Sequence, residues 1–284
     1  MVAASSIMEQ NPADPAEAEQ SRDAGPDAST LAPPTSEYMF AGYAGAPYTY
    51  SSDVTVHKEG KHSFTVKDVD WVGKPFENPI YYGARIVRWF EGGRTGTMLD
   101  FTHSKTIAPL DEEKTFSGTI NGAPAPERAK LGDVFRRLEA SHGHNMLTLN
   151  GLFRLPSIGL RLHPYVGIGA GVALPHSEVQ MIKDPGRTYE YQYAGPVGQA
   201  LIGIEFRVPR MSYFFEYKFT LASYQMPLTH QDGDILFTDL WRQFKRWLSG
   251  EEPPGGFLWT NLVSHQGIAG LGVRFSTAPA ATSP

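Results

Sequence analysis

Eight segments of the chain alternate between large apolar side chains and small or polar ones with a period of two. This pattern limits the fold more than any other feature. In the segment 165–174, Val166, Ile168 and Val172 fall on one face, and Tyr165 shares the other face with glycines. A period of two is that of a β-strand, whereas a helix would mix the two sets. The predicted strands cover residues 38–50, 80–90, 95–104, 147–155, 165–174, 199–206, 213–221 and 263–275.

The connections between these segments have two lengths. The short ones are 91–94, 156–163 and 208–210, and the long ones are 51–79, 105–143, 175–187 and 226–256. Because antiparallel neighbours reverse direction at each step, the short turns fall at one end of the sheet and the long loops at the other. This arrangement is typical of membrane barrels with short periplasmic turns. The sequence therefore predicts an all-β fold, an eight-stranded antiparallel up-and-down outer-membrane β-barrel with short helices in the long loops.

The face opposite the large apolar side chains mixes glycines with charges of both signs, which would satisfy one another inside a closed sheet. Tyr and Trp side chains gather near the strand ends, as an interfacial girdle requires. A soluble ligand-binding barrel, with its apolar set pointing inward, remains an alternative because alternation does not say which face is which. The polar set comprises Arg85, Asp100, Asn150, Arg154, Glu205, Glu216, Lys218 and Arg274.

Composition excludes several classes of protein. The chain has no cysteine, which rules out disulfide frameworks and Cys-based metal sites, and its net charge of -5 argues against a nucleic-acid partner. No apolar run reaches the roughly 18 residues of a transmembrane helix. Residues 1–36 are rich in Pro, Ala, Asp and Glu and show no export signal. We predict a disordered segment 1–36, a barrel over 37–276 and a flexible tail 277–284, forming a monomer.

Two of the long loops contain residues at helical spacing. In 234–250, aromatic and aliphatic residues recur opposite Arg, Lys and Gln, which predicts an amphipathic helix. Such a helix would either lie on the outer leaflet of the membrane or pack over the barrel mouth. A shorter helix is predicted over 131–140.

Histidine is concentrated at the long-loop end. Of the nine histidines, His163 belongs to a short turn, and the other eight lie in the long loops or the adjoining strand ends. His103, His144 and His176 are each near acidic residues in sequence or by strand pairing. Imidazoles and carboxylates that converge there would ligate a divalent metal or act as acid and base, the alternative being a hydrogen-bonded polar rim.

Several multi-residue blocks between residues 38 and 275 resemble the rhizobial outer-membrane lipid A oxidase family. These are FTVKDVDWVGKPFE (64–77), YGAR (82–85), DFTHSK (100–105), HGHNMLTLN (142–150), PYVGIG (164–169), PHSE (175–178) and YQYAGP (191–196). The resemblance implies an eight-stranded outer-membrane barrel that uses dioxygen to oxidise the proximal glucosamine of lipid A to 2-aminogluconate, releasing hydrogen peroxide. It also implies a divalent metal.

The resemblance and the histidine pattern together give a site hypothesis with lipid A, or lipopolysaccharide, of the outer leaflet as partner. The expected metal ligands are His103, His142, His144 and His176, and the expected catalytic residues are His103, His144, Glu178 and Asp70, or Asp68 in its place. Lipid A phosphates would be bound by Lys105, Arg187, Arg242 and Arg246. The alternative is a non-enzymatic small barrel with a structural or surface-interaction role. Convergence of at least three of the predicted His, Glu and Asp side chains would distinguish the two.

Overall fold

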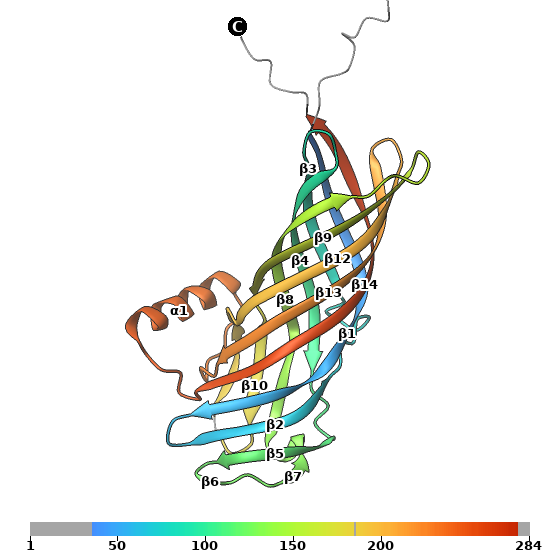
Figure 1. The fold of residues 1–284 in the computed structure, drawn as a ribbon. Helices are drawn as coiled ribbons and strands as arrows, with labels where there is room; N and C mark the ends of the chain where they lie inside the picture. The colour runs from blue at the N-terminus through green and yellow to red at the C-terminus, as the bar shows by residue number, and fades with distance from the viewer. Residues whose placement is uncertain (1–35, 185, 278–284) are drawn as a thin grey trace, which may run out of the picture. The chain divides into compact units, whose positions relative to one another are not determined.

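The computed structural model describes residues 36–184 and 186–277, and these form a closed barrel of eight antiparallel strands (Figure 1). Each strand pairs with the next, and the first pairs with the last from Ser36 opposite Thr277 onward. The predicted eight-stranded barrel is confirmed. Its strands are β1 (Ser36–Lys58), β3 (Tyr82–Trp89), β4 (Thr95–Ile107), β8 (Phe135–Arg154), β9 (Leu162–Ala173), β12 (Gly195–Arg207), β13 (Met211–Pro227) and β14 (Phe257–Thr277).

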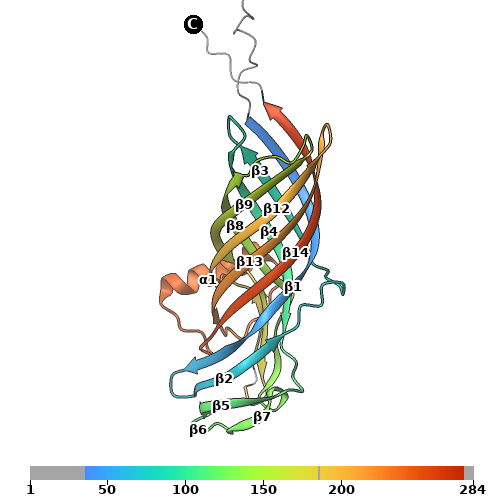
Figure 2. The same cartoon turned by 45° about the vertical axis from the view of Figure 1, so that its right-hand side comes forward.

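The three short turns lie at one end of the barrel and the long connections at the other, as predicted, but the long connections contain more sheet than expected. Figure 2 shows β1 continuing beyond the barrel as a hairpin with β2, against which β5 packs. The additional strands are β2 (His62–Trp71), β5 (Glu113–Ile120), β6 (Ala123–Pro124), β7 (Arg128–Lys130), β10 (His176–Met181) and β11 (Arg187–Tyr191). Buried apolar side chains of β2, β5 and β10 form the largest hydrophobic cluster together with the long-loop ends of the barrel strands.

The prediction of a helix over 131–140 is wrong. Only Leu131–Asp133 form a single 3-10 turn, and β8 begins two residues later at Phe135. Leu138 pairs with Val179 of β10, and Phe135 and Leu138 are buried in the large cluster. Pairing across the sheet therefore overrides the local helical spacing.

The amphipathic helix predicted over 234–250 is present as α1 (Leu236–Ser249). Figures 1 and 2 both show it beside the barrel wall, not over the open end. No helix in the described ranges is long and apolar enough to cross a bilayer. The predicted segments 1–36 and 277–284 lie outside the described residues, apart from Ser36 and Thr277 at the ends of β1 and β14.

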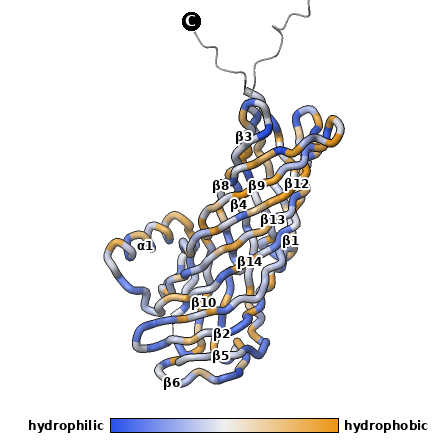
Figure 3. The backbone as a smooth tube through the Cα atoms, viewed as in Figure 1, coloured by the Kyte–Doolittle hydropathy of each residue, from blue (hydrophilic) through white to orange (hydrophobic). Residues whose placement is uncertain are grey.

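The large apolar side chains of the barrel strands point outward, away from the lumen. Along β13, Phe215, Tyr217 and Leu221 are exposed, whereas Glu216 and Lys218 are buried. Ile168 of β9 is 74% exposed and Leu271 of β14 is 51% exposed. Figure 3 shows hydrophobic residues recurring along the barrel strands and hydrophilic ones at the β1–β2 hairpin.

This orientation excludes the soluble ligand-binding barrel, which would enclose the same side chains. A continuous apolar exterior is unfavourable in water but favourable in the hydrocarbon of a membrane. A closed barrel also provides a hydrogen-bond partner for the backbone groups of each strand, as a membrane requires. The protein is therefore an outer-membrane β-barrel.

The lumen is filled by a charge-balanced cluster of two cations and two anions, Arg85, Lys218, Asp100 and Glu216, here called the lumen tetrad. Arg85 contacts Asp100 at 3.1 Å and Glu216 at 2.8 Å, and Lys218 Nζ lies 2.6 Å from Asp100 Oδ2. All four side chains are at most 1% exposed. The charges cancel within the cluster, and the interior leaves no path for a diffusing solute.

Removing one charge from the lumen tetrad should destabilise the barrel strongly. Lys218→Met or Glu216→Gln leaves an uncompensated buried charge, which costs about 3–5 kcal/mol of unfolding free energy. The double variant restores neutrality and should lose less than the sum of the two. Urea unfolding in phospholipid vesicles measures this, with Arg128→Gln, which breaks an exposed ion pair to Glu113, as a control that leaves the midpoint unchanged. Additive losses in the double variant would contradict the coupling.

Candidate functional site

Three polar side chains lie side by side on the outer wall of the barrel, on the face that otherwise meets lipid. Tyr82 of β3 pairs with His103 of β4, which pairs with Asn145 of β8. Further along the same strands, the same face presents Ile86 and Leu99, which are 43% and 44% exposed. We call Tyr82, His103 and Asn145 the wall cluster. It marks the long-loop edge of the apolar surface.

The contacts of His103 fix its ring. The ring stacks on that of Tyr82 with centroids 4.6 Å apart, and its Nδ1 lies 2.8 Å from Asn145 Oδ1. Asn145 Nδ2 donates to the carbonyl of Leu174, so its oxygen must accept from Nδ1–H of His103. The proton is thus held on Nδ1, and Nε2, buried without a hydrogen-bond partner, keeps its lone pair. This nitrogen has the lone pair of a base or a ligand, but neighbouring atoms enclose it in this structure.

Lys105 follows on the same face of β4. Its Nζ donates to the carbonyl of Glu77 at 2.9 Å, in the loop 72–81 that connects β2 to β3. A bridge between Val72 and Ile107 fastens this loop to the end of β4. Lys105 has no carboxylate within ion-pair distance in the described ranges, so its charge is available to an anion.

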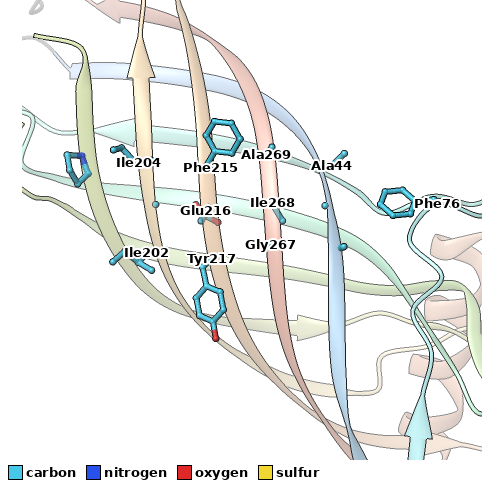
Figure 4. Close-up of a pocket in the computed structure, with 14 residues that line it drawn as sticks. Ala44, Phe76, Ile202, Ile204, Phe215, Glu216, Tyr217, Gly267, Ile268 and Ala269 are labelled. Carbon is cyan, nitrogen blue, oxygen red and sulfur yellow. The ribbon is translucent and has the colours of Figure 1, made fainter. Parts of the chain in front are cut away.

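An apolar hollow of about 880 Å³ lies in the outer wall, lined by residues of β1, β9, β12, β13 and β14 and by Phe76, but not by the wall cluster or Lys105. Small residues form its floor on β1 and β14, and Figure 4 shows Phe215 and Tyr217 of β13 on one side, with Phe76 beside Ala44 on the other. Phe76 belongs to the loop that contacts Lys105, and Ala44 pairs with Tyr82. The hollow therefore extends to the strand next to Tyr82, while His103 lies one strand further on.

His144 lies on the inner face of β8. Its neighbour in register is Ser104, one residue from His103, but the two histidines are on opposite faces of the barrel wall. His144 Nδ1 is hydrogen-bonded to the hydroxyl of Tyr224, and both side chains are buried. The strands β4 and β8 pair as the sequence predicted, so the backbones of His103 and His144 lie close together. Their imidazole rings, however, lie on opposite sides of the barrel wall.

His142 and His176 form a third group with Tyr189 and Tyr191. The ring centroids of His142 and His176 are 5.4 Å apart, and His176 lies 4.4 Å from Tyr189 and 4.6 Å from Tyr191. His176 Nε2 lies 2.9 Å from the carbonyl of Gly233, to which it donates. Burial lowers the pKa of His176, which favours the neutral imidazole.

The predicted carboxylates lie elsewhere. Glu178 faces Glu139 across the β8–β10 pair, and burial, followed by the charge of Glu139, raises the pKa of Glu178. Asp70 accepts from Lys114 at 2.6 Å, and this hydrogen bond is the main reason that the pKa of Asp70 falls to about 2. Asp68 is exposed, and its backbone N–H donates to Asp53. In the described parts of the chain, no three His, Asp or Glu side chains are grouped closely enough to hold a metal ion. The convergence expected for the oxidase, and set against the non-enzymatic barrel, is therefore not found among these residues.

The predicted phosphate-binding arginines are already paired. Arg187 binds Asp232 through two nitrogens, at 3.2 and 2.8 Å. On α1, Arg242 lies 2.5 Å from Asp239, and Arg246 donates to Gln231 at 2.5 Å and lies 3.9 Å from Glu190. Of the four predicted anchors, Lys105 is the one with a free charge on the outer wall.

Tyr82 and Asn145 were not among the predicted site residues. The sequence did contain a hint of such partners. His103 and Lys105 alternate in step with Leu99 and Phe101, so they belong to the face that points toward lipid. A polar side chain on a lipid-facing parity needs a partner on the neighbouring strand. Identifying those partners requires the register between strands.

No family model matches this chain, and no curated protein matches it. Solved structures with a similar fold include Neisserial surface protein A, with a TM-score of 0.36 and 10% identity, covering 84% of this chain and 97% of that one. The outer membrane protein AlkL in lipid bilayers gives a TM-score of 0.38 and 14% identity, covering 98% and 100%. The outer membrane protease OmpT from Escherichia coli gives 0.34 and 8%, covering 86% and 97%. These likenesses concern the fold alone.

The hydrogen bond from His103 to Asn145 predicts an unusual tautomer. Nitrogen-15 NMR of histidine-labelled protein in vesicles above pH 7.5 should show His103 protonated on Nδ1 and unprotonated on Nε2. The signal is assigned by its absence from the spectrum of His103→Gln. Asn145→Ala removes the acceptor and should move the proton toward Nε2, the usual site in a free imidazole. A wild-type ring protonated on Nε2 would contradict the geometry.

Proposed function

We propose that this outer-membrane barrel is a lipid A oxidase that takes its substrate laterally from the outer leaflet. The observation that carries the proposal is the position of His103 and Lys105 on the lipid-facing side of the wall. Both side chains are 4% exposed. Among the described residues, His103 Nε2 keeps a lone pair without a hydrogen-bond partner, and the Lys105 charge has no carboxylate within ion-pair distance.

Lateral access follows from the filled lumen. A substrate cannot pass between side chains of the lumen tetrad, whereas a lipid in the outer leaflet already contacts the outer wall. Lipid A combines acyl chains with a phosphorylated glucosamine head. The acyl chains would occupy the hollow lined by Ala44, Phe215 and Phe76. A phosphate at the long-loop edge of the outer wall would pair with Lys105.

The proposed reaction is an oxidation at the anomeric carbon of the proximal glucosamine, in a lipid A whose anomeric hydroxyl carries no phosphate, so the phosphate paired with Lys105 lies elsewhere on the head. The hemiacetal loses two electrons and two protons to dioxygen, giving a lactone and hydrogen peroxide, and water then opens the lactone to 2-aminogluconate. In this proposal, His103 Nε2 takes the proton from the anomeric hydroxyl; the hydrogen bond to Asn145, which holds the imidazole in the accepting tautomer, supports this role. Tyr82 covers the ring and limits access of water.

The divalent metal implied by the sequence resemblance has no complete ligand set among the described side chains. His103 offers one nitrogen on the outer wall, His144 lies on the inner face, and His142 and His176 form a pair without a third ligand. These residues do not fit a three-ligand centre as they stand, so no step is assigned to a metal here. Metal analysis of the purified protein and of His142→Ala/His176→Ala tests this part of the proposal separately.

The activity test is incubation of protein in vesicles with lipid A and dioxygen. We expect hydrogen peroxide and a gain of one oxygen atom on the lipid in equal amounts. His103→Gln should reduce the rate by about 100-fold, the lower range for loss of a general base. Lys105→Met should raise the substrate concentration needed for half-maximal rate, with a smaller effect on the maximal rate.

His163→Ala is the matched control, since it removes a histidine from the short-turn end and should leave the rate unchanged. Absence of both peroxide and mass gain with correctly folded wild-type protein would overturn the oxidase proposal and favour the non-enzymatic barrel. Full activity in His103→Gln would remove the wall cluster from the reaction.

A further inference from the structure

Helix α1 has its polar face toward the protein and its apolar face toward the surroundings, the reverse of a helix packed on a globular core. Asp239 is 1% exposed and accepts from the backbone N–H of Tyr191. Gln243 both accepts from the N–H of Tyr193, at 2.7 Å, and donates to its carbonyl, at 2.8 Å. These polar contacts fix the rotation of the helix about its axis.

The opposite face is largely uncovered by the described parts of the chain. Phe237 is 82% exposed, Trp241 59% and Trp247 75%, and the rings of Trp241, Phe244 and Trp247 lie in a row with centroids 5.6 and 6.1 Å apart. An exposed aromatic row of this kind marks a surface that is buried against something apolar. Lys245, also exposed, lies one turn from Trp241, with a stem long enough to reach a polar layer.

The position of α1 indicates what covers this face. An apolar hollow of about 590 Å³ lies between the helix and the barrel, lined by Leu174, Tyr193, Leu240, Gln243, Phe244 and Trp247. The carbonyl of Leu174 accepts from Asn145 of the wall cluster, so the hollow lies at the long-loop edge of the lipid-facing wall. Figures 1 and 2 show the helix beside the wall at this end.

We propose that α1 is embedded in the outer leaflet, with its aromatic row among the acyl chains and one acyl chain of a membrane lipid in the hollow against Leu174 and Tyr193. The apolar face of the helix then continues the lipid-facing surface of the barrel. The guanidinium groups of Arg242 and Arg246 remain paired with the protein, on the side away from the acyl chains. This inference does not depend on the oxidase reaction.

The test is tryptophan fluorescence of the full chain refolded in phosphatidylcholine vesicles with bromine on the acyl chains. Trp241→Phe/Trp247→Phe keeps both side chains aromatic, and its spectrum is subtracted from that of the wild type, leaving the signal of the helix. Heat-modifiable gel migration checks that both proteins are folded. The difference signal should lie at short wavelength and lose most of its intensity to bromine near the carbonyl end of the chain, and less to bromine near the methyl end.

Two outcomes would overturn the proposal. A difference signal that resists brominated lipid but is quenched by aqueous iodide would place the aromatic row in water. A signal resistant to both quenchers, with chemical cross-linking between chains that disappears in Trp241→Glu/Trp247→Glu, would show that a second copy of this chain covers the helix. Lipid A oxidation is not used as a readout, so a failure here leaves the proposed activity untouched.

Discussion

The closed lumen depends on a cluster of four buried charges whose sum is zero. Asp100 contacts both Arg85 and Lys218, and Arg85 also binds Glu216 through two nitrogens, at 2.8 and 3.0 Å. A buried ion is tolerated only with its partners present, so this network requires strands β3, β4 and β13 to hold one register. Because the network occupies the interior, any exchange with a lipid or solute must take place on the wall or at the long-loop end.

The wall is where the alternation is violated. On β4, Leu99 and Phe101 are followed on the same face by His103 and Lys105, which would be costly in contact with hydrocarbon. The structure compensates locally: Asn145 satisfies Nδ1, Tyr82 covers the ring, and Glu77 in the overlying loop binds the ammonium group. Deviations from a rule that the rest of the chain obeys are expected at functional sites. The compensation leaves one nitrogen of His103 unsatisfied, and that atom is the basis of the proposed chemistry.

The sequence alone predicted the barrel because parity and turn spacing are local properties. It correctly placed Glu216 and Arg85 inside and Leu271 outside, and it located the short turns. It failed at 131–140, where the pairing of Leu138 with Val179, distant in sequence, decided between helix and strand. Pairing between residues distant in sequence cannot be recognised from the few residues around either partner.

The candidate site was harder to predict for a related reason. His103 and His144 were expected to meet because their strands pair, and the strands do pair as expected. Adjacent positions on a strand point to opposite faces, so two side chains one register step apart can be separated by the sheet itself. Asp70 and the arginines of α1 were candidates by charge, but ion pairing to Lys114, Asp239 and Glu190 could not be seen without the fold.

The wall cluster and helix α1 meet at Asn145 and Leu174. Asn145 orients His103 through one end of its amide and binds the Leu174 carbonyl through the other, and the Leu174 side chain lines the hollow beneath α1. A single amide thus connects the proposed reactive imidazole to the hollow beneath the helix. Since β8 and β9 are held by a continuous ladder from Met146 to Arg154, the barrel itself fixes the positions of Asn145 and Leu174 relative to each other.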